Sequence, residues 1–174
     1  GLFIIIGSIP TILFGYFLHD IFESFFSNLF IVGVALIIMG IILFLTKYTR
    51  GRRKLNIYDS ILIGIAQVFA LIPGISRSGS TISVGLFKGI EKQSIFKFSF
   101  LLAIPAIIGA NILELNNLVL NDIRVDLLSM TISTVIALIV GYLSLKFLFR
   151  MLQKQRFYLF SYYCWVLGII LIII

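Results

Sequence analysis

The chain has 174 residues, of which 60% are hydrophobic and only 12% are charged. Soluble domains carry about 25% charged residues, so composition excludes an ordinary soluble domain and indicates a protein of the lipid bilayer. The net charge of +7 does not indicate a nucleic-acid partner, because membrane proteins concentrate Lys and Arg in their cytoplasmic loops. We expect contact with membrane lipids and no nucleic acid.

Five apolar stretches approach the roughly 20 residues that a helix needs to cross the hydrocarbon core. In chain order they are residues 1–18, 29–45, 98–113, 127–145 and 157–174. We therefore expect an all-α polytopic membrane protein, with a single membrane domain over residues 1–174 and about five transmembrane helices. The first stretch begins without Met or a basic leader, so we expect an N-terminally truncated chain, the C-terminal part of a longer protein.

A sixth region, about residues 60–88, is built differently. Two short apolar pieces, SILIGIAQVFALI and TISVGLFKGI, flank the polar segment PGISRSGS. We expect the Asp-Ser pair at 59–60 to cap the first half-helix and the Pro-Gly pair at 73–74 to end it. The second half-helix should begin near residues 76–78. The region is either one broken span or a re-entrant hairpin that enters and leaves the bilayer on the same side.

The distribution of charge distinguishes these two topologies. Three basic clusters consist of Lys47, Arg50, Arg52, Arg53 and Lys54; Lys88, Lys92 and Lys97; and Lys146, Arg150, Lys154 and Arg156. A re-entrant hairpin puts all three clusters on one side and leaves, on the other, Arg124 with Asp20, Glu23, Glu114, Asp122 and Asp126. The positive-inside rule favours this arrangement. Non-helical backbone at membrane depth must lie in protein or line a wet cavity, so the hairpin tip should face water or a ligand.

Arg77 is the one basic residue outside these groups. An arginine at membrane depth costs about 2.5–3.5 kcal/mol on insertion scales and usually has a function. Two interpretations stay open at this point. Arg77 is either a structural residue paired to a carbonyl or an acid on another helix, or a clamp whose guanidinium matches the oxygens of a phosphate.

The neighbours of Arg77 favour an anion. The start of the second half-helix carries unpaired N–H groups and the positive end of the helix dipole. Ser76 and Ser78 could cap this helix or donate to phosphate, and Ser80 and Thr81 share a helix face with Arg77. The alternative for these small residues, including Gly79, is close helix packing. Gln67 could reach the tip or make an interhelical hydrogen bond.

The segment PGISRSGSTI resembles a motif of the bacterial undecaprenyl-diphosphatase family, the membrane enzymes linked to bacitracin resistance. The family pattern P-G-x-S-R-S-x-x-T is matched by Pro73, Gly74, Ser76, Arg77, Ser78 and Thr81. The stretches GSIPTILFGYFLHD, GIAQVFALIPG and FSFLLAIPAIIGA extend the similarity over essentially the whole chain. Lys97 stands where the family usually has Glu, at the expected cytoplasmic end, where we expect little effect on chemistry.

The resemblance implies hydrolysis of undecaprenyl diphosphate to undecaprenyl phosphate and phosphate in the bacterial plasma (inner) membrane. This recycles the lipid carrier for cell-wall synthesis and confers bacitracin resistance. It implies an inverted-repeat fold, with which a homo-oligomer is compatible. It also implies a divalent cation, Mg²⁺ or Ca²⁺, whose ligands are expected upstream of Gly1. The resemblance makes Arg77 and Ser76 catalytic, and the diphosphate-binding residues Gly74, Ser76, Arg77, Ser78, Gly79 and Thr81.

Two questions stay open at the level of sequence. Neither Ser76 nor Ser78 has an adjacent base in the sequence, so the nucleophile is undecided. The alternative function is a membrane transporter or channel for an anionic or phosphorylated substrate, because transporters also aim the N-termini of broken helices at anions. Since the family's other hairpin is expected upstream, the 174 residues alone should be inactive.

Overall fold

The computed structural model describes residues 1–17, 25, 28–120 and 127–174, and these residues form helices and one isolated β-bridge. The elements are α1 (Leu2–Phe17), α3 (Leu29–Leu45), η1 (Thr46–Tyr48), α4 (Ile57–Phe69), α5 (Arg77–Phe87), α6 (Lys92–Leu120), α7 (Leu127–Gln153), η2 (Phe157–Leu159) and α8 (Phe160–Ile173). The expected all-α fold class is confirmed.

Each of the five predicted stretches contains a helix. Among the described residues, three segments are long and apolar enough to cross a membrane: Leu29–Tyr48, Lys92–Gly109 and Leu127–Gln153. Shorter apolar helices occupy Leu2–Gly15, Ile57–Phe69 and Phe157–Ile173. Helices α6 and α7 extend beyond the predicted stretches, because hydropathy marks only the part of a helix that suits hydrocarbon. The chain is a multi-pass membrane protein.

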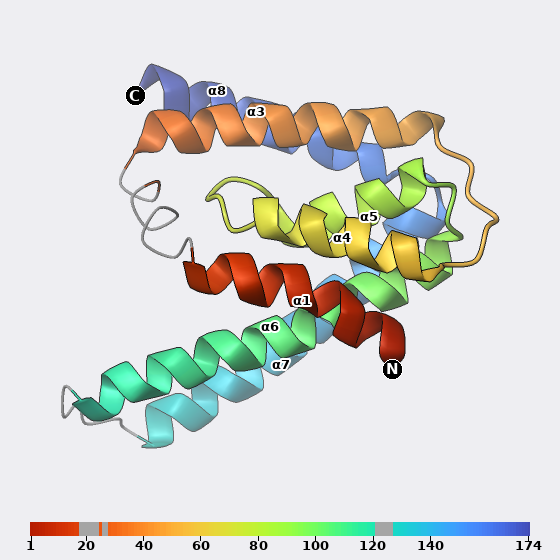
Figure 1. Cartoon of the computed structure of the whole chain (residues 1–174). Coiled ribbons are helices and arrows are strands. Elements are labelled where there is room, and N and C mark those ends of the chain that lie inside the picture. Colours follow the sequence, from red (N-terminus) through yellow and green to blue (C-terminus); the bar gives the residue numbers. More distant parts are fainter. Residues whose placement is uncertain (18–24, 26–27, 121–126) are drawn as a thin grey trace.

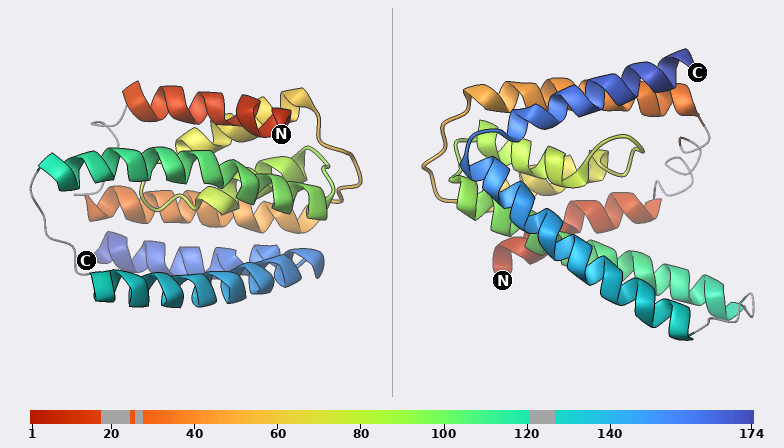
Figure 2. Two further views of the ribbon diagram at one scale, coloured as in Figure 1. Left: turned by 90° about the horizontal axis from the view of Figure 1, so that it is seen from below. Right: turned by 180° about the vertical axis from the view of Figure 1, so that it is seen from behind.

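The hairpin formed by α4 and α5 lies in the middle of the helices (Figure 1). Helices α3 and α8 lie side by side on one side of it, and α1 packs along α4 on the other. Helices α6 and α7 run next to each other and project away from the rest at an angle (Figure 2). The first half of α6 contacts both α1 and α5, so the hairpin is enclosed on several sides.

The two hairpin helices are too short to cross a bilayer. With 13 residues in α4 and 11 in α5, they are about 20 Å and 17 Å long, whereas the hydrocarbon core is about 30 Å thick. The chain just before and at the start of α4 (residues 53–60) and the chain just after α5 (residues 88–91) are called the feet of the hairpin. They meet at one end, where Arg53 and Ile90 form a β-bridge. The structure therefore has the predicted hairpin geometry, and its re-entrant placement in a bilayer stays a prediction.

Both predicted ends of the first half-helix were wrong. Helix α4 begins at Ile57 because Asn56 is its N-cap: the Asn56 side chain accepts from the Asp59 N–H at 2.8 Å, and the Asp59 carboxylate accepts from the Asn56 N–H at 2.9 Å. This reciprocal pair satisfies two otherwise free donors, so residues 59–60 lie inside the helix. Helix α4 ends at Phe69, four residues before Pro73. The chain turns directly after Phe69.

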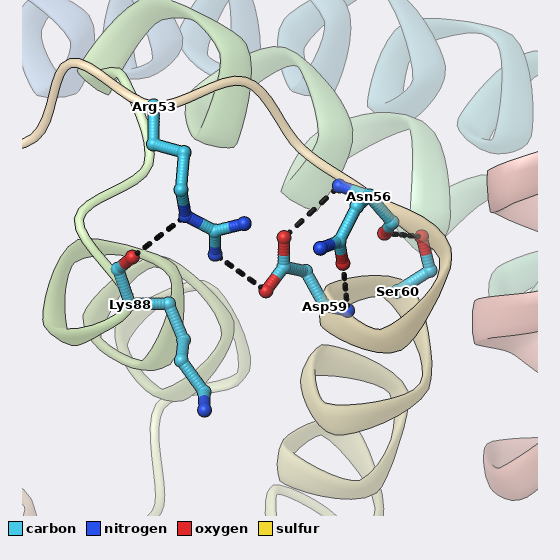
Figure 3. A network of polar contacts seen from close by, with 5 residues as sticks. All are labelled: Arg53, Asn56, Asp59, Ser60 and Lys88. Carbon is cyan, nitrogen blue, oxygen red and sulfur yellow. Dashed lines mark hydrogen bonds and ion pairs between the residues drawn. The ribbon is translucent and has the colours of Figure 1, made fainter.

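An ion pair joins the two feet of the hairpin (Figure 3). The Arg53 guanidinium donates to the Asp59 carboxylate at 2.7 Å and, through Nε, to the Lys88 carbonyl at 3.2 Å. Asp59 is buried, with 3% of its surface exposed, and it also belongs to the N-terminal cap of α4. Arg53 therefore connects the start of α4 to the end of α5 through one side chain.

Members of the three basic clusters lie near one another at one end of the helices, and their placement on one side of a membrane stays a prediction. Arg53 of the first cluster donates to the carbonyl of Lys88 in the second. The Nζ of Lys47 lies 5.3 Å from the ring centroid of Tyr158, close in sequence to Lys154. The predicted opposite side cannot be placed, since Asp20, Glu23, Asp122, Arg124 and Asp126, and the side chain of Glu114, lie outside the described residues.

Helices α1 and α4 approach each other through two glycines. A Cβ added at Gly64 would overlap the Gly7 carbonyl, and a Cβ at Gly7 would lie 3.0 Å from the Ser60 carbonyl. Small residues let membrane helices pack backbone to backbone. This contact places the polar side of α1 directly against the hairpin.

Gly64→Ala should destabilise the protein, because the new methyl group must push α1 away from α4. Overpacking costs about 1–3 kcal/mol, whereas the higher helix propensity of alanine alone would stabilise by up to about 1 kcal/mol. Gly141→Ala in α7 is the matched control, since nothing lies within 4 Å of the added atom. Melting temperatures in one detergent measure both, and a Gly64→Ala value at or above that of Gly141→Ala would contradict this packing.

Arg53→Ala should loosen the feet of the hairpin, whereas Arg52→Ala should not. Both changes remove one positive charge, but only Arg53 makes side-chain bonds to Asp59 and Lys88. Amide hydrogen exchange is the measurement, and we expect faster exchange in residues 56–60 and 88–91 of Arg53→Ala alone. Equal exchange in the two variants would show that the ion pair does not hold the feet together.

Candidate functional site

Two glycines let the hairpin tip, residues 70–79, pack closely against α3. Gly74 has a φ of +94°, and a Cβ there would lie 2.7 Å from the Val32 carbonyl. A Cβ on Gly79 would lie 2.7 Å from the Met39 Cε atom. The positive φ and the close approach both require glycine at position 74. The tip therefore has a fixed position within the helices.

Helix α5 begins at the tip with a serine cap. The Ser76 hydroxyl accepts from the Gly79 N–H at 3.1 Å, and the Ser76 carbonyl accepts from the Ser80 N–H at 2.8 Å. Within the described residues, the backbone N–H groups of Arg77 and Ser78 have no recorded acceptor. Such free donors at the positive end of a helix can bind an anion. The predicted start of the second half-helix is confirmed, with Ser76 and not Ser78 as its cap.

Arg77 combines features of both interpretations left open by the sequence. Its Nη2 donates to the Gln67 side-chain oxygen at 2.9 Å and to the Leu102 carbonyl at 3.0 Å. These partners are those of a structural arginine. Yet Nη2 supplies only two of the five guanidinium N–H groups, and no described residue accepts from Nε or Nη1. Arg77 is half-buried, and these remaining donors have no acceptor among the described residues.

Ser80 and Thr81 share a helix face with Arg77, as their spacing predicts, but their hydroxyls bond to other groups of the protein. Thr81 is fully buried, and its hydroxyl lies 2.6 Å from that of Ser99 on α6. The Ser80 hydroxyl donates back to the Ser76 carbonyl at 3.0 Å and lies against Met39 of α3. Both hydroxyls are satisfied within the protein, so a contact of Thr81 with diphosphate stays a prediction.

A cavity of about 830 Å³ lies between the tip and helices α3, α7 and α8. Its polar wall comes from the tip, with Gly74, Ser76, Ser78 and Gly79. Its other walls are mostly apolar and are formed by Leu36, Leu43, Leu143, Phe147, Leu148, Phe157, Phe160 and Cys164. Arg77 does not line this cavity, because its guanidinium is held on the side of α4 and α6. The tip therefore presents its serines and its arginine to different surroundings.

The described residues do not supply a metal site. They contain no group of three or more His, Cys, Asp or Glu side chains that could hold a metal ion. Nor does any described acid, histidine or lysine bond to the hydroxyl of Ser76 or Ser78. The chain offers donors for an anion, and the groups that would hold a cation or activate a nucleophile are not among these residues.

The sequence left two interpretations open for Gln67, contact with the tip or an interhelical hydrogen bond, and the structure shows both: Gln67 bonds to Arg77 of α5 and to Thr11 of α1. The sequence did not identify Thr11, which bonds to the other end of the Gln67 amide at 3.0 Å, or the Leu102 carbonyl. The only signal for Thr11 was a hydroxyl within the apolar stretch SIPTILFG. A carbonyl partner leaves no signal in the sequence, since every residue carries one.

Comparison with known proteins gives consistent results over the whole chain. The family described as "Bacitracin resistance protein BacA" matches residues 1–170. A protein of Desulforapulum autotrophicum named undecaprenyl-diphosphatase is 45% identical over 174 residues. Proteins with the same name from Methanothermobacter thermautotrophicus and Halothermothrix orenii are 40% and 36% identical over 178 and 176 residues.

The relatives differ in how much of their own length is matched. The three alignments cover 98%, 97% and 98% of this chain. They cover 63% of the Desulforapulum protein, 97% of the Methanothermobacter protein and 68% of the Halothermothrix protein. One relative thus has nearly the length of this chain, and others are longer. The family match over residues 1–170 and these identities show that the chain belongs to the bacitracin resistance protein BacA family.

Proposed function

We propose that the protein containing this chain hydrolyses undecaprenyl diphosphate to undecaprenyl phosphate and inorganic phosphate in the bacterial plasma membrane. Water is consumed, the phosphoanhydride bond breaks, and the lipid keeps one phosphate. The reaction recycles the lipid carrier for cell-wall synthesis and so confers resistance to bacitracin. The names of the three relatives support this proposal.

One observation about the site carries the proposal: Arg77 lies in the first turn of a half-helix, with free guanidinium and backbone donors. A diphosphate has several anionic oxygens, and preorganised donors of this kind stabilise charge that develops during phosphoryl transfer. We infer that Arg77 binds the diphosphate and neutralises it. Ser76, Ser78 and the free N–H groups at the start of α5 would contact the diphosphate from the cavity side of the tip, as neutral donors.

The cavity beside the tip supports a lipid substrate. Its volume of about 830 Å³ lies within the range of about 300–1,000 Å³ that ligand sites occupy. Its serine-bearing wall and its apolar walls suit a molecule with a phosphorylated head and a hydrocarbon chain. A polyprenyl diphosphate has this character, whereas a soluble anion would gain nothing from the apolar walls.

A divalent cation, Mg²⁺ or Ca²⁺, is part of the proposal. The described residues contain no cluster of three or more potential ligands for it, and we propose that residues outside them contribute to holding it. Such a cation would supply further charge neutralisation at the diphosphate. The part assigned to this chain is binding and orientation of the anion.

Arg77→Ala should reduce phosphate release from undecaprenyl diphosphate by about 10²–10³-fold, the usual effect of removing one donor to a reacting oxyanion. The assay uses the complete gene product in nanodiscs, with Arg150→Ala as a control that removes an exposed positive charge. Arg77→Lys keeps the positive charge and loses the forked arrangement of donors. Its phosphate release should lie between that of Arg77→Ala and that of the control. Release by Arg77→Ala equal to that of the control would remove Arg77 from the site.

The same preparation distinguishes hydrolysis from transport. Hydrolysis predicts phosphate release without vesicles, whereas a transporter or channel would move the phosphorylated substrate across sealed vesicles and release none.

Chelation of divalent cations should abolish release and leave binding of the lipid measurable. The 174 residues assayed alone should be inactive, and metal-dependent release from them would show that they suffice.

Ser76→Ala should destabilise the protein by about 1 kcal/mol, because the Gly79 N–H loses its acceptor, whereas Ser78→Ala should not. Ser76→Asn keeps a capping side chain and lacks a nucleophilic hydroxyl. Since no described base contacts Ser76, we expect Ser76→Asn to retain measurable phosphate release at a normal melting temperature. Complete loss of release in that variant would instead assign the chemistry to the Ser76 hydroxyl.

A further inference from the structure

A chain of buried hydrogen bonds connects Arg77 to α1, outside the hairpin. The Arg77 Nη2 donates to the Gln67 Oε1 at 2.9 Å, and the Gln67 Nε2 donates to the Thr11 Oγ1 at 3.0 Å. The Thr11 hydroxyl in turn donates to the Gly64 carbonyl at 3.3 Å. Gln67 is 1% exposed and Thr11 is 6% exposed. The chain therefore runs through three helices and is shielded from solvent.

The chemistry of these groups fixes the direction of every bond. A carbonyl can only accept, so the Thr11 hydroxyl proton must point to Gly64, and the Thr11 oxygen is left as an acceptor. That acceptor requires the amide nitrogen of Gln67, which turns the Gln67 oxygen toward Arg77. An amide can flip by 180° at little steric cost, but here a flip would set two donors against each other at Arg77. Arg77, which can only donate, and Thr11, whose oxygen accepts, thus both require the same orientation of the Gln67 amide.

The position of Thr11 depends on the close packing of α1 and α4. The Gly64 carbonyl that accepts from Thr11 belongs to the residue whose missing side chain lets the Gly7 backbone approach. Gln67 lies three residues further along α4, on the side that faces α1. The glycine contact and the hydrogen-bond chain are therefore one structural unit.

The second acceptor of Arg77 lies on α6 near a break in helical hydrogen bonding. Pro105 lies within α6 and has no N–H, so the Leu101 carbonyl lacks its usual helical donor. Arg77 donates to the neighbouring carbonyl, that of Leu102, at 3.0 Å. Both protons of Nη2 are thereby held by rigid helices, one acceptor from α4 and one from α6.

We propose that Thr11 and Gln67 are positioning residues for Arg77. They hold Nη2 of the guanidinium against the protein, so that Nε and Nη1 present a fixed pair of donors to a phosphate. Neither residue touches the substrate. This inference rests on the proposed function for its ligand, and on the structure alone for the hydrogen-bond chain. Preorganised donors bind developing charge better than mobile ones, so loss of the chain should weaken catalysis while Arg77 itself is retained.

Thr11→Val is the first test, because it replaces the hydroxyl with a methyl group of equal size. We expect kcat/KM for undecaprenyl diphosphate to fall by about 5- to 20-fold in the complete gene product, and Thr11→Ser to restore most of that loss. Thr134→Val in α7 is the matched control, since its hydroxyl bonds only to the Met130 carbonyl of its own helix. A Thr11→Val enzyme as active as the control would overturn the proposal.

A double-mutant cycle separates positioning from a general effect on folding. If Thr11 acts through Arg77, then Thr11→Val should change kcat/KM by less than about twofold in an Arg77→Lys background, because the lysine cannot use the fixed geometry. If the fold-losses in kcat/KM of Thr11→Val and Arg77→Lys multiply in the double variant, then Thr11 acts independently of Arg77, which would contradict the proposal. Gln67→Met is the second variant, in case Thr11→Val lowers stability, and it should show the same dependence on Arg77.

A measurement without turnover distinguishes failure of this inference from failure of the proposed function. In protein labelled with ¹⁵N-arginine, the Arg77 side-chain signal is assigned by its loss in Arg77→Lys. We expect that signal to report a rigid guanidinium in the wild type and in Thr11→Ser, and a mobile one in Thr11→Val and Gln67→Met. Equal mobility in all four proteins would contradict the positioning role whatever reaction the protein catalyses.

Discussion

The arrangement of the hairpin depends on how one cation, Arg77, is held between α4 and α6. Arg77 gives both protons of Nη2 to protein oxygens, one on Gln67 of α4 and one on the Leu102 carbonyl of α6. A charged side chain away from water is costly unless its donors are satisfied. Here only part of the guanidinium is satisfied by the protein, and an anion can complete the rest. The same side chain therefore stabilises the hairpin and defines the candidate site.

Several packing features place that cation. The ion pair between Arg53 and Asp59 joins the feet of the hairpin, and the positive φ of Gly74 turns its tip beneath α3. The contact of Gly7 with Gly64 brings α1 close enough for a hydroxyl to reach the hairpin. None of these contacts takes part in the proposed reaction. Together they fix the position of a half-helix of 11 residues, whose free donors we propose bind an anion.

Much of the fold was predictable because its causes are local. Long apolar stretches indicated the helices, and the Pro-Gly break with a lone arginine indicated the hairpin. The ends of α4 were predicted wrongly because the capping box uses Asn56, and because the chain turns before Pro73 and not at it. Thr11 could not be predicted, since its contact with Gln67 joins residues 56 positions apart. A threonine in an apolar helix usually bonds a carbonyl of its own helix, so only the packing reveals its partner.

The most direct test is the distance between Arg77 and a bound phosphate. Solid-state NMR can measure it between ¹⁵N in the arginine side chain and ³¹P in a non-hydrolysable undecaprenyl diphosphate analogue, with Arg77→Lys to identify the signal. A direct hydrogen bond to a phosphate oxygen requires a nitrogen-to-phosphorus distance of about 4 Å or less. We predict that value for Nε or Nη1 of Arg77. A bound analogue that shows no coupling to Arg77 would contradict the account.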